Sequence, residues 1–411
     1  MRSWPGYLTA GSLLLIAIGL PWSHSFVSIG VGGVLGITLL WPDLRKKLFD
    51  LFHQEPFLTW PWIALYALHF LSYLYTENCP QWWEEMRIKL PLPLLWAATV
   101  VAWRTLPENR QALILWAFHA GLLVVGIATA AKALANFSWA LQEMREARYV
   151  PMVGGISHIY FAGHLIGALL LLFVTPGPHR LRLFVGSLYL AIIHVLALRT
   201  ALFTLYGGLV IGILYWMIRK RHWLLGIGLL GSLAGLIVLL VTFWPPLRSR
   251  YQNLREDLAQ YKRGNLWYLS VGTRLAALEA SWQVFKESPL CGVGIADNRE
   301  AIFEKEARLP YNWGPQFYLL PHHQFVEYAL GFGLIGLGVF LSFWIGAFWR
   351  ERDPLWWAWL AAWLLLMQVE AFLERQMGLT MFLWGMGVLW ARLHPESSYG
   401  SYPNERQPGR G

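Results

Sequence analysis

Two arginines and two histidines are the residues through which this otherwise apolar chain could do chemistry. They are Arg199, Arg274, His322 and His323. Guanidinium groups bind phosphate oxygens in paired hydrogen bonds, and a neutral imidazole accepts a hydroxyl proton near pH 7. Taken singly, Arg199 could as well extend toward the membrane surface, and for the histidine pair a structural role is the better interpretation. Taken together, the four suit the displacement of a diphosphate by an acceptor hydroxyl.

The composition places these residues in a membrane protein. Of 411 residues, 56% are hydrophobic and 14% are charged, whereas a soluble domain has roughly 25% charged residues. Apolar runs of about 17 to 25 residues recur, which is the length of a bilayer-spanning helix. The basic residues behind the net charge of +9 cluster in short loops. This clustering is a topology signal, so we expect no nucleic-acid partner.

We predict an all-α polytopic protein with about twelve transmembrane helices, because backbone groups in lipid have to be satisfied within helices. The predicted spans lie near 5-22, 25-41, 57-76, 90-104, 111-134, 159-175, 183-198, 200-218, 223-243, 323-348, 355-373 and 378-391. Every second loop is basic, as at Arg45 to Lys47 and Arg219 to Arg221. Lys and Arg stay on the cytoplasmic side of short loops. We therefore expect both termini in the cytoplasm, and the Arg199 turn and the longest loop outside.

The spans divide the chain into four parts. Transmembrane helices 1 to 9 fill residues 1-242, and a large polar loop takes 243-322. Helices 10 to 12 fill 323-394, and the tail 395-411 has the composition of a disordered segment. Within the loop, 248-263 predicts an amphipathic helix that either lies on the membrane surface or packs on the loop. A second helix is predicted from Ser270 to Lys286, with Arg274 in its first turn. Function concentrates in loops held by a rigid scaffold, so we expect the site here.

Three segments resemble the O-antigen ligase and O-antigen polymerase superfamily of bacterial envelope glycosyltransferases. Leu198 to Leu202 resembles the family's arginine-bearing span start. Gly272 to Trp282 with Ser288 to Ile295 resembles its arginine helix and Pro-Leu-x-Gly-x-Gly segment. His322 to Leu337 resembles its His-Asn-x-x-Leu segment with Gly-x-x-Gly. The order and the spacing fit over about residues 195 to 340, and a fainter likeness covers Arg148 to Gly163.

The resemblance implies a GT-C-like fold in the bacterial inner membrane and an active site that faces the periplasm. The implied reaction transfers a glycan from undecaprenyl diphosphate to a sugar of the lipid A core, and we expect a monomer. By position, Arg199 and Arg274 would bind the diphosphate, and Arg148 is a further candidate for substrate binding. His322 falls on the family's catalytic histidine and His323 on its asparagine position, so either could be the base. Because undecaprenyl diphosphate is already a good leaving group and the two arginines could stabilise its charge, we expect no cofactor and no metal. No carboxylate is clearly placed as a nucleophile, so we expect a single displacement that inverts the anomeric configuration.

Two other functions compete with this interpretation. A polymerase would use the same donor, but polymerases more often carry two substantial external loops, and here one loop dominates. A twelve-span transporter would gather ionisable residues near the bilayer midplane, and His69, His119, His164 and Glu370 are its candidates. The place where charged residues converge, at the external loop or in the middle of the bundle, separates enzyme from transporter.

We assign no chemistry to two smaller features of the sequence. Cys79 and Cys291 could pair only if both faced an oxidising compartment, and we do not expect a disulfide. The segment Gln81 to Glu85 is the nearest likeness to the Trp-Trp-Asp motif of metal-dependent oligosaccharyltransferases, but it lacks the Asp. We interpret it as an interfacial element with no metal.

Overall fold

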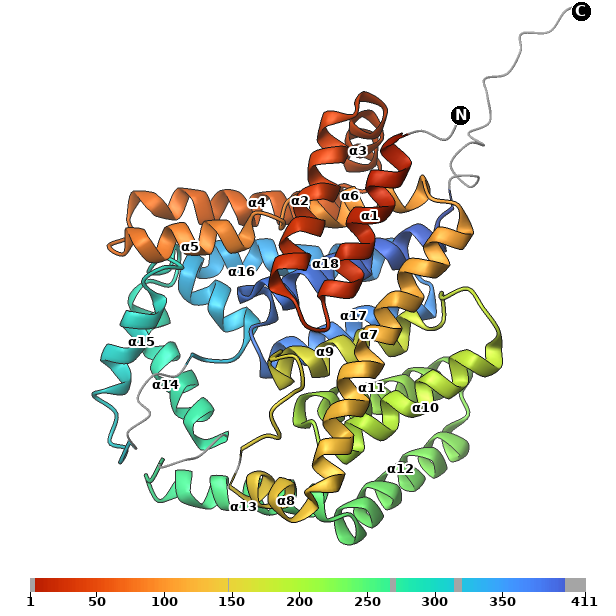
Figure 1. Ribbon diagram of the computed structural model, residues 1–411. Coiled ribbons are helices and arrows are strands. Elements are labelled where there is room, and N and C mark those ends of the chain that lie inside the picture. Colours follow the sequence, from red (N-terminus) through yellow and green to blue (C-terminus); the bar gives the residue numbers. More distant parts are fainter. Residues whose placement is uncertain (1–3, 147, 267–270, 314–319, 396–411) are drawn as a thin grey trace, which may run out of the picture.

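Helices make up almost all of the computed structural model (Figure 1), which describes residues 4–146, 148–266, 271–313 and 320–395. In chain order they are α1 (Trp4–Gly19), α2 (His24–Leu40), α3 (Pro42–Gln54), α4 (Pro56–Leu71), η1 (Ser72–Leu74), α5 (Cys79–Lys89), α6 (Leu95–Arg104), α7 (Glu108–Ala135), α8 (Phe137–Arg145), α9 (His158–Leu171), α10 (His179–Val195), α11 (Arg199–Lys220), α12 (Trp223–Phe243), α13 (Pro245–Lys262), α14 (Val271–Glu287), α15 (Asn298–Glu306), α16 (Gln324–Arg350), α17 (Pro354–Val369), η2 (Phe372–Glu374) and α18 (Gln376–Leu393). The 3₁₀ turns η1 and η2 each follow an apolar helix.

Each of the twelve predicted spans overlaps one of these helices, with ends that differ by several residues. Five described helices are long and apolar enough to cross a bilayer alone, or six if α2 and α3, bent by 95°, form one span. Three further apolar helices, α1, α9 and α17, are shorter. These findings fit an all-α membrane protein that crosses the bilayer several times, while the number twelve and the GT-C-like arrangement stay predictions.

Helix α18 forms the centre of the bundle. Every residue from Met377 to Ala391 is buried, and α6 and α9 pack against this helix. Its aromatic side chains account for much of this packing, since large rings bury the most apolar area. Trp390, for example, meets Trp96 and Trp356 edge-on. The central position of α18 also fixes the segment before it, which links α17 to α18.

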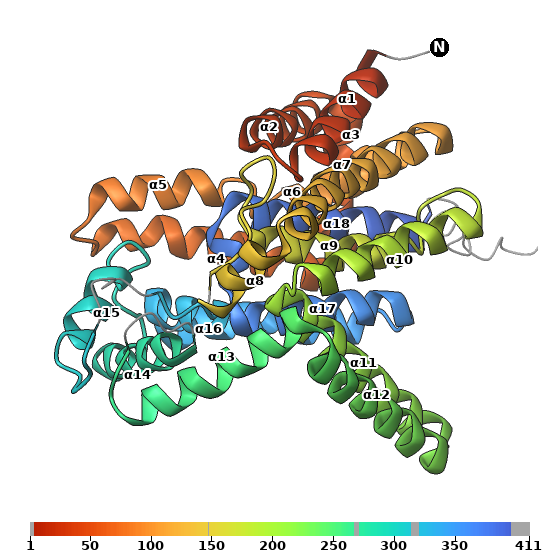
Figure 2. The same ribbon diagram turned by 60° about the horizontal axis from the view of Figure 1, so that its bottom comes forward.

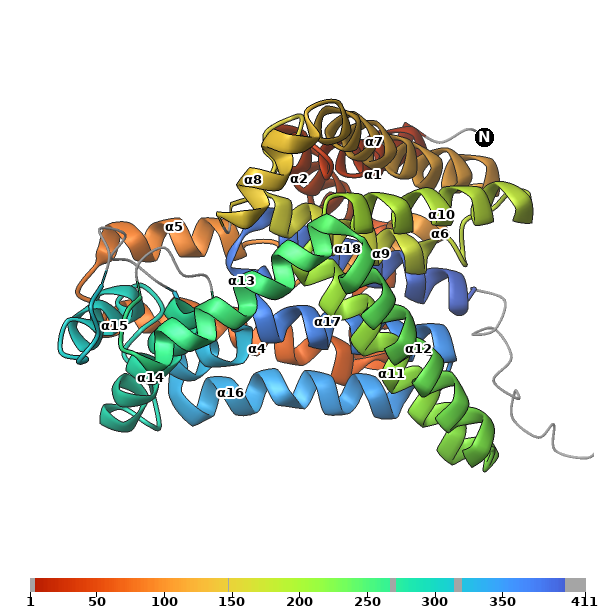
Figure 3. The same cartoon turned by 90° about the horizontal axis from the view of Figure 1, so that it is seen from below.

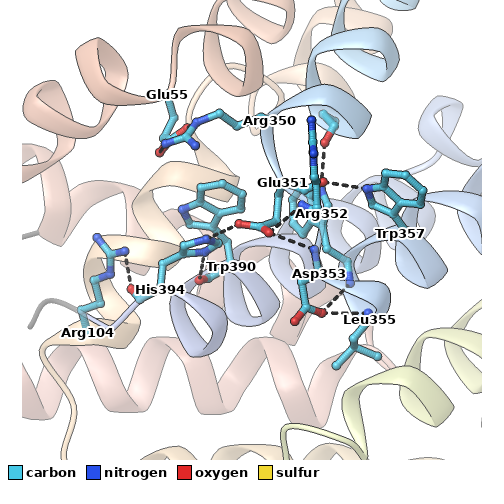
Figure 4. A network of polar contacts seen from close by, with 12 residues as sticks. Glu55, Arg104, Arg350, Glu351, Arg352, Asp353, Leu355, Trp357, Trp390 and His394 are labelled. Carbon is cyan, nitrogen blue, oxygen red and sulfur yellow. Dashed lines mark hydrogen bonds and ion pairs between the residues drawn. The ribbon is translucent and has the colours of Figure 1, made fainter. Parts of the chain in front are cut away.

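The loops gather at two opposite ends of the bundle, as the alternation of basic loops predicts. One end carries the basic loops and a polar network shown in Figure 4: Arg350 forms two hydrogen bonds to Glu55, and His394 contacts Glu351. The other end carries α13, α14 and α15 together with α5 (Figures 2 and 3). Arg250 of α13 reaches the Met144 carbonyl there. We call this second end the loop end.

The large loop packs on α16 through a glycine turn. Gly292 and Gly294 have positive φ values of 71° and 98°, and Val293 donates a hydrogen bond to the Leu330 carbonyl at 2.8 Å. Helix α16 is broken at Gly333, where φ is 62°, and a Cβ there would lie 2.2 Å from the Leu290 carbonyl. This turn therefore joins the loop to the bundle and has a structural role.

Candidate active site at the loop end

Glu370 marks the point where α17 stops. The prediction of a helical span over 355-373 is wrong at this end, because α17 ends at Val369 and Glu370 is extended, with φ −158° and ψ 144°. A carboxylate inside an apolar helix is costly in lipid unless it has partners. The helix ends where this carboxylate finds them, since the extended backbone turns Glu370 toward His322 and Arg274.

The closest partner of Glu370 is His322. Its Nδ1 lies 3.1 Å from Oε1 and 3.0 Å from Oε2 of Glu370. The imidazole is 24% exposed and the carboxylate 10%, so the pair is sheltered but reachable. With Nδ1 as the donor, Nε2 carries the lone pair and can accept a proton. His322 also has a φ of 46°, a left-handed conformation that is uncommon for a residue with a Cβ.

Arg274 joins this pair from the loop. Its Nη1 donates to the Val369 carbonyl at 2.9 Å, and its Nη2 lies 3.8 Å from Oε2 of Glu370. The first turn of α14, which carries Arg274, is fixed by the Val271 N–H, which donates to Asp257 of α13 at 2.9 Å. The loop thus brings a guanidinium group to the same carboxylate as His322.

A second group of cations lies beside Tyr149, and we call Arg199, Arg250 and Tyr149 the cation cluster. The guanidinium carbons of Arg199 and Arg250 lie 5.7 and 4.4 Å from the Tyr149 ring centroid. The Nε and Nη2 atoms of both arginines are buried without a hydrogen-bond partner among the described residues. Burial and the nearby Arg199 lower the pKa of Arg250 to about 10, so Arg250 is still charged at neutral pH. Unpaired buried cations are costly, and an anion would relieve that cost.

The two groups of cations are neighbours. Arg199, Arg250 and Arg274 all lie close enough to His158 to act electrostatically on its ring. That ring stacks on Tyr149 at 3.4 Å between centroids. The loop end therefore concentrates positive charge around His158. The His322–Glu370 pair is connected to this charge through Arg274.

A cavity of about 430 Å³ opens from the cation cluster. Arg199 and Arg250 line it together with apolar side chains of α11 and α12, among them Leu202, Phe203 and Leu240. Its residues on α11 run from Arg199 to Val210, a length of roughly 16 Å at 1.5 Å per residue. Helices α11 and α12 project from the bundle in Figure 3. Only 6% of the most apolar 18-residue stretch of α12 is buried. The cavity has a cationic part and an apolar part open to the surroundings.

The other predicted site residues lie outside these contacts. Burial lowers the pKa of His323, whose Nδ1 is buried without a partner among the described residues. Arg148 is 59% exposed and is paired with Glu143 and Glu146. Both roles stay predictions. Cys79 and Cys291 are free and exposed. The described part of the chain gathers no group of three or more His, Cys, Asp or Glu side chains that could hold a metal ion.

The transporter candidates do not converge in the middle of the bundle. His119 is bonded to Tyr189 at 2.9 Å and to Thr175 at 3.0 Å. His69 contacts the Leu65 carbonyl. Glu370 faces His322 and Arg274 at the loop end. His164 contacts the Met377 carbonyl at 3.4 Å. The position of Glu370 at the loop end favours the interpretation as an enzyme.

Two residues of the site escaped the sequence analysis. From the sequence, Glu370 is only a transporter candidate, although an acidic residue in an apolar run is itself a signal of function. Arg250 lies in the predicted amphipathic helix 248-263 among other basic residues, and nothing in the sequence distinguishes it from Arg248. Its burial, at 6% exposed, is a result of tertiary packing.

The comparison with known protein families now bears on this geometry. Residues 184–341 match the family model described as O-antigen ligase, whereas the comparison with curated proteins found no match. The matched range contains Arg199, Arg250, Arg274 and His322, and Glu370 lies beyond its end. The match supports a ligase- or polymerase-type role in lipopolysaccharide biosynthesis. The chain is a helical membrane protein whose residues 184–341 match the O-antigen ligase family.

Proposed function

We propose that this protein is an O-antigen ligase. It transfers a glycan from undecaprenyl diphosphate to a sugar hydroxyl of the lipid A core, at the periplasmic face of the inner membrane. The observation that carries the proposal is the contact of His322 with Glu370, next to a cationic cavity with an apolar wall. This arrangement supplies a base, a place for a diphosphate and a place for a lipid chain.

In the proposed reaction His322 acts as the general base. Nε2 of His322 takes the proton of the acceptor hydroxyl while its Nδ1 faces Glu370, which favours the imidazolium that forms. The acceptor oxygen forms a bond to the anomeric carbon, and the bond between that carbon and the diphosphate oxygen breaks. Undecaprenyl diphosphate leaves with the electron pair. A single displacement of this kind inverts the anomeric configuration.

The cation cluster and Arg274 serve the donor. Arg199 and Arg250 offer buried N–H groups that lack partners among the described residues, and charge-assisted hydrogen bonds to phosphate are among the strongest that proteins form. As the leaving group departs, charge grows on the diphosphate, and fixed cations stabilise it without reorganising. The apolar wall between α11 and α12 suits the first isoprene units, because burial of hydrocarbon is favourable.

The shape of the loop favours a ligase over a polymerase. The external segment before α9 holds one short helix, α8, whereas the large loop holds α13, α14 and α15. A polymerase, which would bind a second carrier-linked glycan instead, is the alternative that the first experiment has to distinguish.

Complementation tests the proposal. A ligase-null Gram-negative strain with a matched lipid A core would express wild type, His322→Ala, Arg274→Ala or, as a control, Arg248→Ala, with protein levels followed by blot. We expect long-chain lipopolysaccharide with wild type and the control, and its loss with the other two. Longer glycans on the carrier without capped core would identify a polymerase. No change in either product at full expression would contradict both enzyme functions.

A further inference from the structure

The first residue of α16, Gln324, holds the segment that follows α17. Its Oε1 accepts a hydrogen bond from the Leu373 N–H, and its Nε2 donates one to Oε1 of Glu374, both at 2.7 Å. Gln324 is completely buried, so water cannot substitute for either bond. One side chain thereby joins the start of α16 to η2.

A lysine holds the same segment from the other side. Nζ of Lys89, at the end of α5, lies 2.8 Å from Oε2 of Glu374 and donates to the Leu373 carbonyl at 2.5 Å. The Lys89 side chain is 0% exposed. Leu373 and Glu374 are therefore fixed through both backbone groups of one residue and both carboxylate oxygens of the next. We call Gln324, Lys89, Leu373 and Glu374 the clamp.

The clamp is adjacent in sequence to His322 and Glu370, the pair that carries the proposed chemistry. His322 precedes Gln324 by two residues, and Glu370 precedes Leu373 by three. Neither residue of the pair is within a helix: Glu370 is the extended cap of α17, and His322 has a positive φ. Strained conformations at active sites persist only where their surroundings over-determine them. The nearest fixed parts of the chain that can hold these conformations are the start of α16 and the segment Leu373–Glu374, which the Gln324 side chain joins.

We propose that Gln324 is a positioning residue, which sets the distance between His322 and Glu370 by bonding the start of α16 to Leu373 and Glu374. Gln324 does not contact the reacting atoms. Its role is to keep the imidazole on the carboxylate, with Nε2 aimed at the acceptor. This proposal rests on the glycosyl transfer proposed above, and it adds a residue whose only contribution to the reaction is geometric.

The test compares Gln324→Met with Gln376→Met. Methionine matches glutamine in length and removes both hydrogen bonds of the clamp. Gln376 borders the same segment, but it is only half-buried and bonds only Ser28 among the described residues. With purified protein, donor and acceptor, we expect Gln324→Met to lower kcat by about ten- to a hundredfold with little change in KM, as small misplacements of catalytic groups do. The control should retain its rate.

A double variant separates positioning from a general loss of structure. In a His322→Ala background the distance to Glu370 no longer matters, so Gln324→Met should cost no further activity. An equal fold-loss in both backgrounds would overturn the proposal, because it would show that Gln324 supports the fold alone. If Gln324→Met does not accumulate, Gln324→Asn, which keeps the amide but shortens the reach, replaces it in the same comparison.

Amide hydrogen exchange provides a readout that does not depend on transfer. The Leu373 N–H loses its acceptor in Gln324→Met, so the peptide covering residues 370 to 376 should exchange faster than in wild type, and not in the control. Unchanged exchange there would contradict the clamp. A wild-type protein that transfers nothing would contradict the proposed function instead, and the clamp would then be judged by exchange alone.

Discussion

Nδ1 of His322 lies 3.0 Å from Oε2 of Glu370, although the two residues are 48 positions apart in the chain. One precedes α16 and the other ends α17, so the contact exists only once both helices are packed. The carboxylate fixes the ring, and with Nδ1 as the donor it leaves Nε2 free to accept a proton. Arg274 contacts the same carboxylate from the loop.

Replacing Glu370 by glutamine should reduce transfer strongly. The amide keeps the shape of the side chain but cannot favour a positive charge on His322 in the transition state. We expect kcat to fall by about tenfold or more, within the range for general-base catalysis, with the KM for donor little changed. Kinetics on purified protein would show this. A variant with wild-type kcat would remove Glu370 from the mechanism.

The two histidines should respond differently to the same substitution. His322→Asn removes the proposed base and should lower transfer by about a hundredfold or more. His323→Asn should keep most of the activity, because His323 makes no contact with Glu370 and burial lowers its pKa. Lipopolysaccharide ladders at matched protein levels would compare them. The opposite ranking would make His323 the base.

Donor binding should depend on Arg250 and not on Arg248. Arg250 is buried in the cation cluster, whereas Arg248 is bonded to the Thr242 carbonyl near the surface. Loss of a charge-assisted hydrogen bond costs about 1.5–3 kcal/mol, so Arg250→Ala should raise the donor KM by about 10- to 100-fold. Initial rates at varied donor concentration measure this. Equal effects of the two substitutions would mean that net charge alone matters.

The broken helix should tolerate no side chain at Gly333. With φ at 62° and the Leu290 carbonyl 2.2 Å from a Cβ, Gly333→Ala should destabilise the protein by about 1–3 kcal/mol or more. Gly338 in the same helix has open space around it, so Gly338→Ala is the matched control. Thermal unfolding in detergent would rank them, and equal midpoints would refute the docking role of the turn.

Chelation should leave transfer unchanged. The cations that face the donor in the proposed mechanism are Arg199, Arg250 and Arg274, so no step calls for a divalent ion. We expect the same initial rate with and without EDTA in metal-free buffer. A loss of activity that added Mg²⁺ or Mn²⁺ restores would require a different arrangement of the donor.

The apolar helices could be predicted from the sequence because apolar runs of sufficient length can only be helical in lipid. The short polar helices α3, α5, α8 and α15 were not predicted, because they have no such run. Arg199 could be singled out because it lies between two apolar runs, and His322 because it directly precedes one. Arg274 could be singled out because it lies in the first turn of a predicted loop helix that resembles a family segment. The end of α17 could not be predicted, since Leu366 to Ala371 is as apolar as the helix before it except for Gln368 and Glu370. Burial of Arg250 depends on Tyr149 and Met144, which are distant in sequence. Contacts of that kind leave no local pattern.

The cation cluster has a consequence for turnover. Arg199 and Arg250 share one aromatic ring, and their buried N–H groups have no carboxylate partner among the described residues. In the proposed reaction the donor is a diphosphate diester, while the product is a monoester with one more ionisable oxygen. The same cations would therefore bind the product, undecaprenyl diphosphate, more tightly than the glycan-bearing donor. Release of the carrier would then add to the time of each turnover alongside bond formation.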